Sequence, residues 1–411
     1  MRRPRVSDAA QIQGLFVCIG LPIAAFFPFV ALYLERYHGL DASQIGLVIA
    51  FSAGARMIAN PSWGHIADTK WGRLTVLQIC LAGSGIAALA LNVHWALLGI
   101  IVVAAVHSAF LVGQGPNVDA LALTHLGDER MSDYGRMRGW ESLSYAIACF
   151  CFGIALERFG LSWEMPLYAG SVLLVLLWST TIERDRPTEV IEHGRLGSLG
   201  AVFREAPRFW GFLAAVLLVW IGFNAAWNFL ALRIADQGGG TFLIGVGTAL
   251  GGLVEVGVMR GSSRLQERVG LRRAYMLGCC VYGLGFLSWG VVSDPRLLSA
   301  VTMLEGVGFS LLFTTAVVIV GRLVPKSLYS TGNAVTSMVA FGIAPILGAG
   351  LGGFVYQHLG ARVLYGSACA LALAAAVVAW FALDVPGLRE TRGERADELS
   401  VASLPDTGPT V

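Results

Sequence analysis

The chain has 411 residues and a formal net charge of +2 at pH 7, with 55% apolar residues, 14% charged residues and a mean hydropathy of +0.67. Soluble domains average about 25% charged residues, so this composition excludes an ordinary soluble protein and indicates one that lives in a lipid bilayer. A net charge this close to zero gives no reason to expect a nucleic-acid partner.

Twelve apolar stretches follow one another along the chain, and each is long enough to cross the hydrocarbon core as an α-helix. The links between them are short and leave no room for a soluble catalytic domain, so we predict no enzyme and no catalytic residue. The predicted fold class is an all-α membrane protein with twelve transmembrane helices. We expect them over residues 12–34, 44–66, 74–91, 95–123, 136–157, 163–183, 207–232, 242–262, 274–292, 296–322, 330–356 and 361–383.

The longest polar link lies between the sixth and seventh spans and divides the chain into two halves. We predict an N-terminal six-helix bundle over 1–183, a cytoplasmic linker over 184–206 and a C-terminal six-helix bundle over 207–383. The tail over 384–411 has too little apolar content to fold, so we expect it to be disordered and cytoplasmic.

A weak internal repeat relates the two halves. Residues 45–73 reappear near 244–273, and each copy places one ionisable residue at mid-helix, Arg56 in the first and Glu255 in the second. An acid, a glycine and an arginine then follow the end of each helix. Two related bundles can rock against each other around a central site, so the repeat indicates transport.

The basic residues predict the orientation, because Lys and Arg concentrate on the cytoplasmic side of a membrane. With both termini inside, most of the 29 basic residues fall in cytoplasmic segments, whereas Arg56 lies alone within a span. We therefore expect a multi-pass protein with both termini in the cytoplasm.

One short motif is typical of nucleotide sites, but its position argues against that interpretation. Residues 348–353 match GxGxxG inside an apolar span with no preceding strand, and a GxxxxGK[ST] loop is absent. The seven cysteines show no metal-ligand spacing. We therefore expect no cofactor and no metal, and an ion gradient as the source of energy for uphill transport.

The twelve spans, the six-plus-six repeat and the loop Gly64, Asp68, Gly72 and Arg73 in the order GxxxDxxxGR together resemble the major facilitator superfamily. Within that superfamily, RMIANPSWGHIAD at 56–68, DALAL at 119–123 and YGRMRGWES at 134–142 resemble the phenylpropionate permease branch. That branch is related to lactose permease and to nucleoside–proton symporters.

This resemblance implies two pseudo-symmetric six-helix bundles and a secondary active transporter in a bacterial inner membrane. The expected partners are a small organic solute, first an aromatic acid such as phenylpropionate, and protons carried by symport. A sugar or nucleoside symporter is the alternative within transport, and a non-transporting sensor or scaffold is the alternative outside it. We expect a monomer.

Ionisable residues within the spans are candidates for the solute and proton pathway, since a charge at that depth must be paired or face water. We expect Arg56 to face a central cavity, where it either pairs with an acid or receives an anionic substrate. Glu255 and Glu305 lie near mid-membrane, where removal from water favours the neutral carboxyl that a proton carrier needs. We expect one of them, Glu305 first, to bind the co-transported proton; the alternative is a permanently charged partner of an arginine. His107 is a further candidate for proton or substrate binding.

Aromatic and amide residues predict the character of the cavity. Asn224 and Asn228 are four residues apart and share a helix face, which should look at protein or water because unpaired amides are unfavourable in lipid. With Phe26 and Trp227, they suit a small aromatic acid, although a sugar or nucleoside could also stack there.

Two charged loops resemble the superfamily's gating loops and are expected to bias which face is closed. The first contains Asp68, Gly72 and Arg73, and the second contains Glu267 and Arg272. Asp119, near the inner end of the fourth span, is placed to meet either Arg136 or Arg138 at the start of the fifth.

Overall fold

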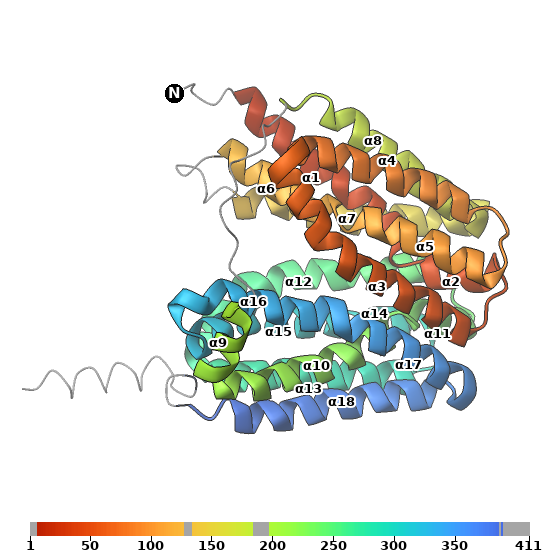
Figure 1. Cartoon of the computed structure of the whole chain (residues 1–411). Helices are drawn as coiled ribbons and strands as arrows, with labels where there is room; N and C mark the ends of the chain where they lie inside the picture. The colour runs from red at the N-terminus through yellow and green to blue at the C-terminus, as the bar shows by residue number, and fades with distance from the viewer. Residues whose placement is uncertain (1–5, 127–133, 184–196, 386–387, 389–411) are drawn as a thin grey trace, which may run out of the picture.

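The computed structural model describes residues 6–126, 134–183, 197–385 and 388, and in these ranges the regular elements are all helices (Figure 1). Twelve helical segments within them are long and apolar enough to cross a membrane, from Ala10–Arg36 to Ala361–Ala382. The predicted all-α membrane fold with twelve spans is confirmed. The tail from 389, most of the linker and the first five residues lie outside the described part.

The N-terminal half contains six spans, several of which are built from two consecutive helices. Its elements are α1 (Val6–Phe26), α2 (Val30–Arg36), α3 (Ala42–Ile66), η1 (Ala67–Trp71), α4 (Arg73–Leu91), α5 (Leu97–Leu111), α6 (Gln114–Leu126), α7 (Tyr134–Phe159), η3 (Leu161–Trp163) and α8 (Glu164–Ser179).

The helix α9 (Gly197–Glu205) precedes the C-terminal half, which repeats the same plan. Its elements are α10 (Pro207–Trp227), α11 (Leu230–Asp236), α12 (Thr241–Val269), α13 (Leu271–Val291), α14 (Pro295–Val301), α15 (Met303–Leu323), η4 (Lys326–Leu328), α16 (Tyr329–Met338), η5 (Val339–Ile343), α17 (Ala344–Leu359) and α18 (Ala361–Ala382).

Four glycines with positive φ mark the internal repeat in the backbone. Gly72, Gly160, Gly270 and Gly360 have φ of 77°, 89°, 80° and 87°, and each joins the second to the third span of a three-helix group. Side chains with a Cβ rarely adopt this conformation. The positive φ therefore explains why the second glycine of the GxxxDxxxGR loop, Gly72, is a glycine. The same explanation holds for the other three positions.

The two halves form two separate bundles that lie one against the other, coloured red to yellow and green to blue in Figure 1. Each half has its own large cluster of buried apolar side chains. We call the end of the molecule that carries α9 and α16 the linker end, and the opposite end, where α2 and α11 lie, the far end.

The two halves approach most closely at two pairs of glycines toward the far end. Gly46 of α3 lies against Gly353 of α17, and Gly153 of α7 lies against Gly245 of α12. A Cβ on Gly245 would lie 2.3 Å from the carbonyl oxygen of Cys149, and one on Gly353 would lie 2.4 Å from that of Ala42. The helices can therefore touch through their backbones only because these positions lack side chains, as is common where membrane helices pack.

Polar side chains join the same helix pairs at the far end. The carboxylate of Glu157 on α7 accepts hydrogen bonds from the Thr241 hydroxyl (3.0 Å) and from the backbone N–H of Phe242 (3.2 Å), at the first turn of α12. In the other pair, the side-chain oxygen of Gln357 on α17 accepts a bond from the backbone N–H of Ala42 (3.0 Å), at the first turn of α3. Each half thus satisfies a free N–H at a helix start in the other half, and the far end is closed in this conformation.

We predict that Gly245→Leu opens the far end, because the added side chain cannot fit beside the α7 backbone. The distance between spin labels at Trp163 and Leu359, both exposed far-end residues of opposite halves, should increase in a background without native cysteines. Gly366→Leu is the control, since a Cβ there meets no neighbour within 4 Å, and it should leave the distance unchanged. An equal distance in both variants would contradict the role given to the glycine pairs.

Candidate functional site

A cavity of about 200 Å³ lies between the halves. The N-terminal half contributes lining residues from α1, α2, α3, α4, α5 and α8, and the C-terminal half contributes Phe223, Asn224, Trp227 and Asn228 of α10 and its end. The cavity is therefore asymmetric, although the two halves share one plan. Five residues singled out in the sequence line it, namely Phe26, Arg56, Asn224, Trp227 and Asn228.

Arg56 is the charged residue among those that line the cavity. It lies in the middle of α3, one turn beyond Ser52, which also lines the cavity. In the described part of the chain its guanidinium forms no ion pair with an acid. Of the two arrangements considered for Arg56, the structure thus has the one in which a guanidinium faces the cavity without an acidic partner.

The amides of Asn224 and Asn228 lie where the seventh span is interrupted between α10 and α11. Each side-chain nitrogen donates to a carbonyl oxygen one turn earlier, Asn224 to Trp220 and Asn228 to Asn224, both at 2.8 Å. An amide has two N–H donors and an acceptor oxygen, so each keeps one donor and its oxygen for a ligand. Trp227 completes this wall and stacks on Phe223 with ring centroids 5.9 Å apart.

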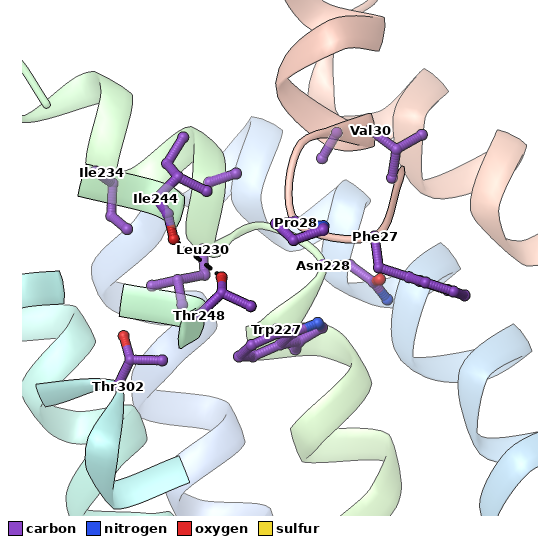
Figure 2. Close-up of a pocket in the computed structure, with 12 residues that line it drawn as sticks. Phe27, Pro28, Val30, Trp227, Asn228, Leu230, Ile234, Ile244, Thr248 and Thr302 are labelled. Atoms are coloured by element: carbon purple, nitrogen blue, oxygen red, sulfur yellow. Dashed lines mark hydrogen bonds between the residues drawn. The ribbon is translucent and has the colours of Figure 1, made fainter. Parts of the chain in front are cut away.

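The first span is interrupted opposite the seventh, and the two breaks face each other across a small hollow (Figure 2). Phe27 and Pro28 come from the turn between α1 and α2, and Trp227 and Asn228 come from the matching break. The hollow measures only about 20 Å³. The two breaks thus lie together at the interface of the halves, and interruptions of membrane helices are typical of solute sites in transporters.

His107 lies one layer behind the cavity wall. Its side chain is fully buried, and its ring lies 4.5 Å from that of Phe26 and 4.9 Å from that of Tyr168 between centroids. Neither ring nitrogen has a hydrogen-bond partner, and the imidazole is close enough to Arg56 to interact with its charge. The sequence placed His107 on the pathway, and the structure places it against the pathway without lining the cavity.

Glu255 and Glu305 do not line the cavity. They lie together where α12 packs on α15, and their carboxylates interact electrostatically. Close packing of the two helices produces this neighbourhood, since a Cβ on Gly306 would lie 2.2 Å from the carbonyl oxygen of Gly251. The Ser310 hydroxyl, 3.0 Å from the backbone oxygen of Glu255, donates to it and holds the same contact.

The charged residues at the linker end form ion pairs within each half. Arg73 lies 2.6 Å from Asp68 across the turn that contains Gly72, and Arg138 of α7 pairs with Asp119 of α6. Of the two arginines expected near Asp119, Arg138 is thus the one that pairs with it. Arg136 lies in the first turn of α7, and its side chain lies outside the described part.

Tyr134 and the second charged loop complete the linker end. Burial raises the pKa of the Tyr134 phenol above its ordinary value, so the hydroxyl stays neutral and accepts a bond from Arg138 (3.1 Å). In the C-terminal half, Arg272 pairs with Asp384 (2.7 Å) and its guanidinium lies 3.5 Å from the Trp380 ring centroid. Glu267 is exposed near the end of α12.

The sequence reasoning missed three polar groups. Glu164 is a fully buried carboxyl in the first turn of α8, and neither of its oxygens has a hydrogen-bond partner. Its signal was an acid in the first turn of the predicted span 163–183, which the sequence reasoning did not single out. Glu157 and Gln357 were missed because a cap between helices of different halves leaves no pattern in the local sequence.

Comparisons with known proteins agree with this architecture. Residues 15–367 match the model of the family described as the MFS_1 like family. The chain is 27% identical over 371 residues to the maltose permease of Geobacillus stearothermophilus, a match that covers 87% of this chain and 90% of that protein. It is 24% identical over 379 residues to the MFS-type transporter YhhS of Escherichia coli strain K12, covering 89% of each.

Among solved structures, the nucleoside transporter NupG superposes with a TM-score of 0.83 over 92% of this chain and 100% of that one, at 14% identity. A likeness at that identity shows the shared fold and no more. The family match covers most of the chain, and the curated relatives are aligned over nearly their full length. The chain therefore belongs to the MFS_1 like family and is a multi-pass membrane transporter of the MFS type.

Proposed function

We propose that this transporter moves a small organic anion with an aromatic body, such as phenylpropionate, by alternating access and with proton symport. The observation that carries the proposal is Arg56, a guanidinium in the cavity wall without an acidic partner. None of the described residues that line the cavity has a carboxylate. A solute carboxylate would supply the missing opposite charge and would receive two parallel hydrogen bonds from the guanidinium.

The rest of the cavity fits the remainder of such a solute. Its volume of about 200 Å³ lies below the roughly 300–1,000 Å³ of drug-sized sites, which favours a small molecule. Phe26, Phe27 and Phe223 offer apolar faces for a ring, and the free donors of Asn224 and Asn228 can support the carboxylate.

A sugar or nucleoside is the second candidate. One relative is named maltose permease, and a wall of Trp227 with two amides also suits a polar ring that stacks and hydrogen-bonds. A neutral sugar, however, would leave the charge of Arg56 uncompensated, so the anion is placed first.

For the coupled proton we propose the pair Glu255 and Glu305. Where two carboxyls lie close together between membrane helices, the negative charge of one disfavours ionisation of the other. The pair is therefore suited to hold one proton and to exchange it. Arg138 of the other half interacts with the Glu255 carboxylate. Movement of the halves would change that interaction and hence the affinity of the pair for the proton.

The linker end is proposed to face the cytoplasm of a bacterium, with both termini inside and the chain a monomer in the inner membrane. The excess of basic residues at that end supports this orientation. The pairs Asp68–Arg73 and Asp119–Arg138 would then lie at the inner gate, with Arg272 and Glu267 as their counterparts in the C-terminal half. In the proposed orientation the far end faces outward, and the conformation described is closed to the outside.

We predict that Arg56→Gln weakens binding of 3-phenylpropionate about 10- to 100-fold, the loss expected for one charge-assisted hydrogen bond of about 1.5–3 kcal/mol. Binding to the purified protein would be measured by calorimetry, with 3-phenylpropionamide as the neutral analogue. The wild type should prefer the acid, and the variant should bind acid and amide alike. Glu183→Gln, at an exposed position after α8, is the control for a change of charge elsewhere.

If neither compound binds while a sugar or a nucleoside does, the second candidate replaces the first. If Arg56→Gln binds the acid with unchanged affinity, Arg56 takes no part in solute recognition.

We predict that Glu305→Gln and Glu255→Gln abolish accumulation driven by an inward proton gradient and retain solute exchange, because exchange needs no net release of a proton. Labelled 3-phenylpropionate uptake into proteoliposomes would be compared with and without the gradient, and counterflow would be measured in the same vesicles. Gradient-driven accumulation that survives in both variants would remove this pair from proton coupling.

A further inference from the structure

Glu164 is an ionisable side chain that the proposed solute site and the Glu255–Glu305 pair do not use. It lies in the first turn of α8, is 0% exposed, and receives no hydrogen bond at either carboxyl oxygen. The next residue, Met165, lines the cavity. The carboxyl is therefore inside the N-terminal half and one residue away from the cavity wall.

A charged carboxylate does not fit these surroundings. An isolated ion in a low-dielectric interior is so unfavourable that such groups take up a proton instead. The start of α8 favours negative charge through the helix dipole, but this effect is small beside the loss of hydration, and no backbone N–H of the turn reaches the oxygens.

The neighbouring titratable groups do not stabilise a charged carboxylate at Glu164 either. Tyr33 of α2 is close enough to interact with the charge of Glu164, but its hydroxyl hydrogen is donated to the carbonyl oxygen of Leu91 (2.9 Å). The Tyr33 hydroxyl hydrogen is therefore not available to stabilise a carboxylate at Glu164. The Tyr33 oxygen can accept a hydrogen bond from a protonated Glu164 carboxyl. On the other helices packed on α8, namely α1 and α4, the titratable side chains that the structure describes are Cys18, Cys80 and Arg73. Arg73 lies at the opposite end of α4, and no ion pair joins Glu164 to any of the three.

Two further buried polar side chains without hydrogen-bond partners, Tyr168 and His107, lie in the same half as Glu164. Tyr168 lies one turn further along the same face of α8, and its ring is 4.9 Å from that of His107, which has two unpartnered nitrogens. His107 in turn lies near Arg56, so a second positive charge on the imidazole would be repelled there. A charged imidazole at His107 is therefore disfavoured, and His107 does not supply a positive charge that would stabilise a carboxylate at Glu164.

We propose that Glu164 is a proton-binding site of the N-terminal half, separate from the Glu255–Glu305 pair, and that it holds its proton while the far end is closed. Opening of the far end would let water enter beside Met165, hydrate the carboxyl and allow it to exchange that proton. A role of Glu164 in coupling proton movement to solute movement rests on the proton symport proposed above. The binding of a proton at Glu164 does not depend on that proposal.

The test is infrared spectroscopy of the purified full-length protein in lipid at neutral pH, with no solute. The difference between the spectra of the wild type and Glu164→Gln should contain the C=O stretch of a protonated carboxyl, sensitive to exchange into D₂O. The same band should remain in the double variant Glu255→Gln and Glu305→Gln, from which the proton of that pair is gone. Glu183→Gln is the matched control, because that carboxylate lies at an exposed position after α8 and should contribute no such band.

An unchanged protonated-carboxyl band in Glu164→Gln would overturn the proposal. If that variant does not fold, Glu164→Asp serves instead, since it should keep the band and move its frequency, and an unmoved band would count against the site. Because no solute is present, the result stands even if 3-phenylpropionate is not transported. In proteoliposomes that do transport it, Glu164→Gln should keep exchange and lose stimulation by the proton gradient.

Discussion

The close backbone contact between the two halves at the far end is the constraint on which the rest of the structure depends. Two glycine pairs let α3 meet α17 and α7 meet α12, and no residue with a Cβ fits at Gly245 or Gly353. Since lipid supplies no hydrophobic force between helices, such contacts depend on packing and on bonds between polar groups. The caps by Glu157 and Gln357 provide those bonds across the same pairs.

With the far end closed, ionisable groups in the membrane are distributed among distinct sites. Arg56 faces the cavity without an acid, the pair Glu255 and Glu305 lies at a helix contact of the C-terminal half, and Glu164 is enclosed in the N-terminal half. If positive and negative groups were together, they would form ion pairs that neutralise each other. Their separation leaves the cation available to a solute and the carboxyls available to protons.

The shared plan of the halves does not make the cavity symmetric. The positive-φ glycines repeat in all four three-helix groups, yet most of the lining residues come from the N-terminal half, and α10 alone supplies the walls from the C-terminal half. The repeat thus accounts for the scaffold and for the matching far-end caps, whereas the proposed solute recognition rests on residues that the two halves do not share.

Sequence alone determined the all-helical fold and its twelve spans, and it predicted that Arg56, Asn224 and Asn228 face protein or a cavity, because hydropathy, helical periodicity and charge in a span are local properties. Only the tertiary structure decided that Arg56 has no acidic partner among the described residues, that Glu305 lies away from the cavity and that Glu164 is fully buried. Those facts depend on which helices pack together, and the glycine contacts that fix the packing join residues about 90 to 310 positions apart in the chain.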